Sequence, residues 1–136
     1  MAQPFDDPSI SDDDGLVRFV PPWHVIKDDN LGGLRPTSAA FDMSPEDGCM
    51  SVDLEKSLLQ AGLEPCHGLA SRPAGFGAVR LLAGVVRSVQ LAMFQDPLPE
   101  NPFHGQIANL VTPGRITTGT KRTLSKNSEW LAIPRA

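Results

Sequence analysis

The sequence predicts a small α+β domain of short, mostly antiparallel strands with two or three helices. Three observations lead to this class. The chain has 136 residues, which is the size of one ordinary domain. Short β-branched and aromatic segments alternate with segments of helical apolar spacing. Thirteen prolines and twelve glycines separate these segments and indicate many loops. We expect residues 16–136 to form this single domain.

Residues 1–15 are predicted to be a disordered acidic tail. They contain five aspartates and no lysine or arginine, a charge of −5, and few apolar side chains to offset the entropy of ordering. The rest of the chain carries +1, which gives the formal net charge of −4. From Asn101 onward the charge is +4. This basic end is expected to face solvent or to bind an acidic partner, the tail included.

The first half of the chain is predicted to consist mainly of strands. Residues 16–20, LVRFV, are β-branched and aromatic and stop at two prolines. Residues 38–41, SAAF, and 49–54, CMSVDL, are predicted to form a hairpin around a turn rich in Asp, Ser, Pro and Gly. The second of these strands alternates apolar and polar residues, so its apolar side chains are expected to face inward: Met50, Val52 and Leu54.

Helices are predicted mainly in the second half. Asp53 is expected to cap a helix that ends at Gly62. Residues 78–94 are ambiguous between helix and strand. We favour a mostly buried helix over 78–89, followed by an edge strand at 91–94. The segment FHGQIANLV is predicted to be a strand. The last helix is expected from about Thr118, with three basic side chains in solvent: Lys121, Arg122 and Lys126.

The first candidate site is a ligand-binding group made by Arg35, Thr37 and Ser38. A guanidinium offers a planar set of donors that matches phosphate or carboxylate, and the hydroxyls complete the set. Neither a Walker motif nor GxGxxG accompanies these residues. The alternative is that the hydroxyls bond to nearby backbone and Arg35 pairs with an aspartate.

The candidate catalytic residues are His24 and His104. Each follows or precedes prolines near the junction of a loop and a strand, where a scaffold can hold a general acid or base. The alternative is that either histidine donates a hydrogen bond to a backbone carbonyl.

Other catalytic groups receive little support from the sequence. Cys49, Cys66 and His67 show no CxxC spacing, so neither a metal nor another cofactor is expected. A nucleophilic serine is not expected either, because no GxSxG occurs and no serine has an acid–base partner nearby in sequence. Two cysteines are too few for a disulfide framework, which favours the cytoplasm.

The segments LRPTSAAF, MSVDLE and DPLPENPFH resemble those of a group of short uncharacterised bacterial proteins, over residues 16–131. No established activity follows from this resemblance. The chain also resembles ADP-ribosyltransferase-like and RNA 2′-phosphotransferase-like enzymes, with His24 and Ser38 in the positions of their early His and later Ser. Their Gln-x-Glu or Glu-x-Glu pair has no counterpart, and Glu100 and Glu129 are the candidate acids.

Together these observations favour a small bacterial accessory protein that binds another protein. A free strand edge at residues 91–94 is the expected contact. The alternative is a small nucleotide-handling enzyme, ADP-ribosyltransferase-like or phosphotransferase-like, that uses His24, Arg35, Ser38 and His104. The longest apolar region is broken by charged residues, so no membrane span is expected. The absence of Tyr and the acidic pI of about 5.2 argue against nucleic acid as a partner.

Overall fold

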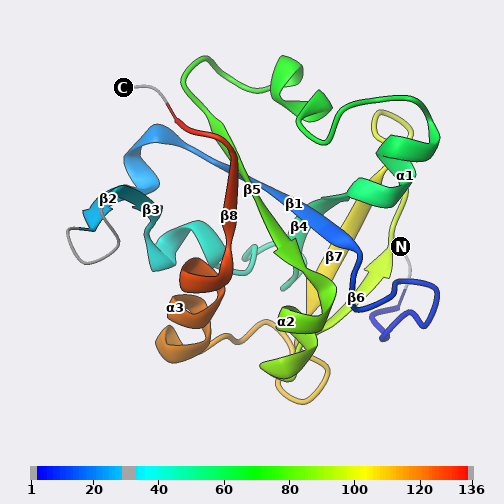
Figure 1. The fold of residues 1–136 in the computed structure, drawn as a ribbon. Helices are drawn as coiled ribbons and strands as arrows, with labels where there is room; N and C mark the ends of the chain where they lie inside the picture. Colours follow the sequence, from blue (N-terminus) through cyan, green and yellow to red (C-terminus); the bar gives the residue numbers. More distant parts are fainter. Residues whose placement is uncertain (1–2, 29–32, 135–136) are drawn as a thin grey trace.

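Six antiparallel strands form the main sheet, and two further strands form a separate hairpin (Figure 1). The computed structural model describes residues 3–28 and 33–134. The strands of the sheet, in spatial order, are β6 (Ala92–Gln95), β7 (His104–Ala108), β4 (Met50–Leu54), β1 (Gly15–Val20), β5 (Gly77–Leu82) and β8 (Glu129–Ala132). The hairpin consists of β2 (Val25–Asp28) and β3 (Gly33–Pro36).

Short helices connect the strands within the described residues. The α-helices are α1 (Glu55–Gln60), α2 (Ala83–Ser88) and α3 (Thr118–Asn127). The 3₁₀ helices are η1 (Pro22–His24), η2 (Ser38–Phe41) and η3 (His67–Ser71). The predicted α+β class, with mostly antiparallel strands and two or three α-helices, is confirmed. In the part of the chain that is described, no helix has the length and apolarity needed to cross a membrane.

The sheet has one apolar face and one partly polar face. In β4 the side chains of Met50, Val52 and Leu54 are buried on the apolar face, as the alternation predicted. There they join one core with Val86 of α2 and Leu124 of α3. The neighbouring positions of β4, Ser51 and Asp53, point to the other face because successive side chains of a strand alternate. We call this second surface the polar face.

The helix favoured for residues 78–89 is wrong over its first part. Gly77–Leu82 is strand β5, which pairs with β1 along six residues. Its side chains alternate, with Val79 and Leu81 fully buried in the core. A run of apolar residues does not distinguish a buried strand from a helix, and here pairing with β1 decides. The helix is limited to α2, and Gln90, with φ of 64°, follows it.

Two other predicted elements also differ. Residues 38–41 form η2 rather than a strand, because Ala40 and Phe41 turn into the core beside α3. Strand β4 therefore pairs with β1 and β7, and the predicted hairpin between residues 38–41 and 49–53 does not form. The last helix ends at Asn127, and the chain continues as β8 on the edge of the sheet.

The expectation of a disordered acidic tail is wrong for residues 3–14, which lie against α2 and β6. Ile10 is buried in the core. Arg87 of α2 pairs with Asp6 at 3.1 Å and with Asp12 at 2.7 Å. The backbone N–H of Asp7 donates to Met93 O at 2.9 Å. The acidic segment thus pairs with a cation of α2, and these contacts offset its ordering entropy.

The same segment covers the edge strand proposed as a docking site. β6 is the outer strand of the sheet, as expected for residues 91–94. All four of these side chains are buried, and the ring of Phe5 packs on that of Phe94 with a centroid separation of 5.7 Å. The expected free edge at 91–94 is therefore wrong, because the N-terminal segment occupies it.

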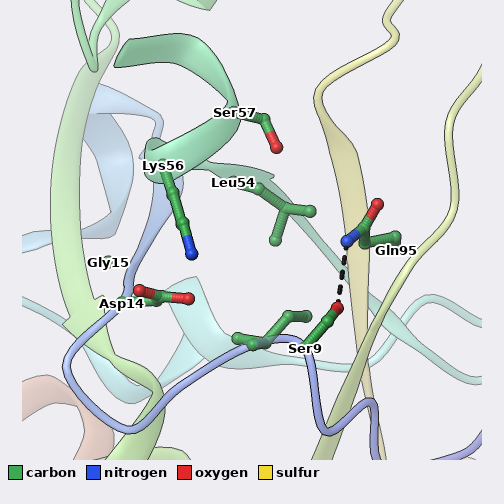
Figure 2. Close-up of a pocket in the computed structure, with 8 residues that line it drawn as sticks. Ser9, Asp14, Gly15, Leu54, Lys56, Ser57 and Gln95 are labelled. Atoms are coloured by element: carbon green, nitrogen blue, oxygen red, sulfur yellow. Dashed lines mark hydrogen bonds between the residues drawn. The ribbon is translucent and has the colours of Figure 1, made fainter. Parts of the chain in front are cut away.

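Figure 2 shows a pocket beneath this segment, where Asp14 and Lys56, at the start of α1, point toward each other and Ser9 lies beside Gln95. The Gln95 side chain donates to Ser9 Oγ at 3.2 Å across its wall. The cavity measures about 30 Å³, which is the volume of roughly one water molecule. It therefore offers no room for a substrate.

Arg87→Ala should loosen the N-terminal segment. The substitution removes two ion pairs and the hydrogen bond from Arg87 to Asp7 O at 3.0 Å. Partly exposed pairs contribute about 0.2–1 kcal/mol each, so we expect docking to weaken by about 1 kcal/mol. Amide hydrogen exchange at Asp7 and Ile10 should accelerate accordingly. Arg115→Ala, at an exposed arginine elsewhere, is the control, and equal exchange in both variants would contradict the assignment.

Candidate active site

The register of β4 against β7 places four polar side chains together on the polar face. Ser51 lies opposite Gln106, and Asp53 lies opposite His104. Directly opposed residues of antiparallel strands share a face, and diagonal neighbours also come within reach. His104, Gln106 and Asp53 are buried, whereas Ser51 is exposed. The result is a polar cluster with one accessible hydroxyl.

Ser51 and His104 form a hydrogen-bonded pair. His104 Nε2 lies 3.1 Å from Ser51 Oγ, and His104 Nδ1 lies 2.8 Å from the backbone O of Asp96. A carbonyl oxygen only accepts, so Nδ1 of the neutral ring carries the proton and Nε2 accepts from the Ser51 hydroxyl. The carboxylate Oδ2 of Asp96 is 3.7 Å from Nδ1. This is the arrangement of a serine, its base and a group that orients the base, here the backbone carbonyl of Asp96.

The sequence left open that His104 donates a hydrogen bond to a backbone carbonyl. The bond from Nδ1 to Asp96 O confirms this alternative. Ser51 has no acid–base partner nearby in sequence, and the fold supplies one from 53 residues away. No local motif marks this pair. The available signal was the alternation of polar residues in residues 49–53 and 104–106, which places them on one face only after the two strands are paired.

An acidic cavity of about 540 Å³ adjoins the pair on one side. Gln106 Nε2 donates to Asp47 Oδ2 at 3.1 Å and to Asp96 Oδ2 at 3.3 Å. These two carboxylates fix the orientation of the amide, whose Oε1 is buried and has no hydrogen-bond partner among the described residues. Burial, with the charges of Asp47 and Asp96, raises the pKa of the nearby Cys49 thiol. We call this space the acidic cavity.

A larger cavity of about 660 Å³ adjoins the pair on the other side, between η3 and the loop of residues 96–103. Its walls include Arg72, His67 and Phe103. The Arg72 guanidinium lies 4.5 Å from the centre of the Phe19 ring, and the rings of His67 and Phe103 meet edge to face at 6.4 Å. Ser51 and His104 line both cavities, so the pair stands between the acidic cavity and a larger one whose lining holds Arg72 together with the carboxylates of Asp53 and Glu100.

Asp53 anchors the wall of the larger cavity. The expectation that Asp53 caps α1 is wrong, because Leu54 occupies that position without a side-chain cap. Asp53 is 3% exposed, and its Oδ1 accepts from Asn101 Nδ2 at 2.8 Å. At Gly68 a Cβ would lie 2.8 Å from Asp53 Oδ2 and 2.6 Å from the Phe19 ring. Only glycine permits η3 to approach the sheet this closely.

Arg18 supports the strand that carries Ser51. Its guanidinium donates to Ser51 O at 2.8 Å and to Ala40 O at 3.0 Å. Burial, together with the positive charge of Arg72, lowers the pKa of Arg18 to about 10. Arg18 therefore remains protonated at neutral pH, and its charge lies directly beside the backbone of the candidate nucleophile.

The predicted ligand-binding residues lie in a different place. Arg35, Thr37 and Ser38 line one cavity of about 470 Å³ beside α3. Arg35 Nε also pairs with Asp28 at 2.7 Å, which confirms part of the alternative given for it. That these three residues bind a ligand stays a prediction.

The predicted catalytic residues are not gathered with them. His104 lines the acidic and larger cavities, and neither of these includes Arg35. The backbone O of His24 accepts from Thr37 N at 2.9 Å, but His24 lines none of these three cavities. Of the candidate acids, Glu129 pairs with Arg80 at 3.5 Å and Glu100 lines the larger cavity.

Within residues 3–28 and 33–134, no three or more His, Cys, Asp or Glu side chains are arranged to hold a metal ion. Both cysteines are free thiols. Burial, with the charge of Glu64, raises the pKa of Cys66, so neither cysteine carries the depressed pKa of a reactive thiolate.

No protein-family model, curated protein or solved structure matches the chain. The resemblances noted from the sequence therefore remain predictions.

Asn101→Ala should destabilise the protein by leaving the Asp53 carboxylate without this donor. An unsatisfied buried acceptor costs about 1–3 kcal/mol, so we expect the free energy of unfolding to fall by about 2 kcal/mol. Chemical denaturation measures this change. Asn127→Ala, which removes an exposed bond to Thr123 O, is the matched control and should cost about 0.5 kcal/mol. Equal losses would contradict an anchoring role for Asn101.

Proposed function

We propose that the protein is a hydrolase that cleaves an ester or amide with Ser51 as nucleophile and His104 as general base. The single observation that carries this proposal is the 3.1 Å contact between Ser51 Oγ and His104 Nε2, with Nδ1 bound to Asp96 O. A serine hydroxyl is a weak nucleophile until a base accepts its proton. Here the base is buried and oriented, while the hydroxyl is accessible from two cavities.

The reaction proceeds in two halves. Ser51 Oγ attacks the carbonyl carbon while its proton passes to His104 Nε2. Collapse of the tetrahedral intermediate breaks the bond to the leaving group, which takes that proton and departs. Water then attacks the acyl group on Ser51, gives a proton to His104, and releases the acid with restoration of the serine. The carbonyl and carboxylate of Asp96, at 2.8 and 3.7 Å, stabilise the transient imidazolium.

The two cavities suggest how a substrate lies across the pair. The acidic cavity carries Asp47 and Asp96 together with the unpartnered Oε1 of Gln106, a set of acceptors that suits an ammonium or guanidinium group. On the other side the larger cavity contains one guanidinium, Arg72, of the sign that stabilises an oxyanion, and two carboxylates, Glu100 and Asp53, the latter bound to Asn101. We propose an ester or amide with a cationic group on one side of the scissile bond.

A second candidate is the bacterial accessory protein that binds another protein. One observation favours it: the side chain of Trp23 is 70% exposed. Tryptophan is enriched in protein–protein interfaces relative to the rest of the surface. In either role we propose a cytoplasmic protein, which the two free thiols support.

Ser51→Ala should abolish covalent labelling by a fluorophosphonate probe. It should also reduce hydrolysis of p-nitrophenyl acetate by on the order of 10³-fold, because nucleophile and base act as a unit. His104→Ala should have the same effect. Ser88→Ala is the control, since the exposed hydroxyl of Ser88 only donates to Val85 O within α2. Labelling that persists in Ser51→Ala would rule out Ser51 as the nucleophile.

Asp47→Asn should change the preference for a charged substrate. The p-nitrophenyl esters of Nα-acetyl-lysine and Nα-acetyl-norleucine are of similar length, and only the first carries an ammonium group. Loss of one carboxylate should lower kcat/KM for the lysine ester by about tenfold, equivalent to about 1.4 kcal/mol, and leave the norleucine ester unchanged. Asp42→Asn, at an exposed aspartate paired with Lys121, is the control. Equal effects on both esters would show that the acidic cavity does not select for charge.

A further inference from the structure

A further polar cavity lies between the β2–β3 hairpin, η2 and α3. It measures about 470 Å³ and is lined by Ile26, Arg35, Thr37, Ser38, Arg122 and Lys126. Ile26 and Arg35 are directly opposed in the hairpin and therefore share one face. Arg122 and Lys126 are four residues apart on α3 and share one side of that helix. We call this space the basic cavity.

The charge of the basic cavity is positive. Its lining contains three cations and no carboxylate. Asp28, outside the lining, pairs with Arg35, so the local sum is 3 − 1 = +2. The pair uses Nε of Arg35, and the guanidinium has further N–H donors on its other edge. Lys121, on the same helix, pairs with Asp42 and takes no part in the lining.

A buried hydroxyl in the lining has no partner within the described part of the chain. Thr37 Oγ1 is shielded from solvent and makes no hydrogen bond there. The alternative that this hydroxyl serves the local backbone is therefore wrong for Thr37. Its backbone is held in place, since Thr37 N donates to His24 O at 2.9 Å and the neighbouring Pro36 O accepts from Ser125 Oγ at 2.5 Å. Because the atom is shielded from solvent, a χ1 rotation of Thr37 is needed to bring its hydroxyl from the cavity wall to a ligand with acceptor oxygens.

We propose that the basic cavity binds the phosphoryl group of a small phosphorylated molecule. A phosphate monoester carries two negative charges and three terminal oxygens, which match a local charge of +2 and a mixture of guanidinium, ammonium and hydroxyl donors. Ile26, 44% exposed, offers an apolar contact to the rest of the ligand. The cavity shares no lining residue with the Ser51–His104 pair, so this site is independent of the proposed hydrolase.

The ligand is a small molecule rather than a nucleic acid. A polymer of phosphates is bound through several cations spread along its length. Here the lining cations converge on one cavity, and the chain as a whole has a net charge of −4.

Titration of the full-length protein with AMP and with inorganic phosphate, followed by amide NMR, tests the site. We expect both probes to change the amide chemical shifts of Thr37, Ser38 and Arg122. The shifts of these three residues should reach saturation at the same probe concentration. Adenosine, which lacks the phosphoryl group, should cause no shift there. Absence of these shifts at about 10 mM phosphate or AMP would overturn the proposal.

Three variants separate the site from a general charge effect. Arg122→Ala combined with Lys126→Ala should weaken AMP binding by at least about tenfold, and Thr37→Val, which removes only the hydroxyl, should weaken it severalfold. Lys121→Ala should leave the affinity unchanged, because this lysine is committed to Asp42. An equal loss in Lys121→Ala would overturn the site, since it would show attraction to the whole helix.

Two further measurements distinguish the possible ligands and the two proposed sites. Tighter binding of a single-stranded RNA oligomer than of AMP, with a salt dependence of several released counterions, would overturn the small-molecule assignment. Ser51→Ala should bind AMP as the unmodified chain does. A loss of AMP binding in Ser51→Ala would overturn the independence of the two sites. Failure of the hydrolase proposal leaves this result unaffected.

Discussion

The antiparallel pairing of β4 with β1 and β7 is the constraint on which the rest of the structure depends. It places Met50, Val52 and Leu54 in the core and, by the same alternation, Ser51 and Asp53 on the polar face. A shift of one residue would exchange the two sets and bury hydroxyl and carboxylate among aliphatic side chains. The same register of β4 against β7 therefore determines both the packing of the core and the contact between Ser51 and His104.

The sequence predicted the features that depend on neighbouring residues alone. The α+β class, the inward face of β4 and the helix stop at Gly62, with φ of 76°, follow from composition, alternation and backbone preference. Strand β5 was missed because an apolar run is read identically in a buried strand and a helix until its partner β1 is known. Residues 38–41 were missed because burial of Phe41 beside α3 outweighs strand propensity in so short a segment.

The candidate site was predicted only in part, since its members come from distant segments. His104 was identified as a catalytic candidate from its junction between loop and strand, and the geometry agrees with that position. Its partners were not identified from the sequence. Ser51 precedes His104 by 53 residues, and Gln106 belongs to the site only through its hydrogen bonds to Asp47 and Asp96. Arg35, Thr37 and Ser38 were found together because they are neighbours in sequence, and they do line one cavity.

The placement of the acidic segment explains why the protein has surfaces of opposite charge. The C-terminal helix was a possible docking face for this segment, yet Asp6 and Asp12 pair with Arg87 of α2 instead. Arg122 and Lys126 of α3 are then left to line the basic cavity, while Asp47 and Asp96 form the acidic one beside Ser51. The charges of residues 16–136, which sum to only +1, are thus separated in space by more than their sequence order shows, into an acidic cavity and a basic one that share no lining residue.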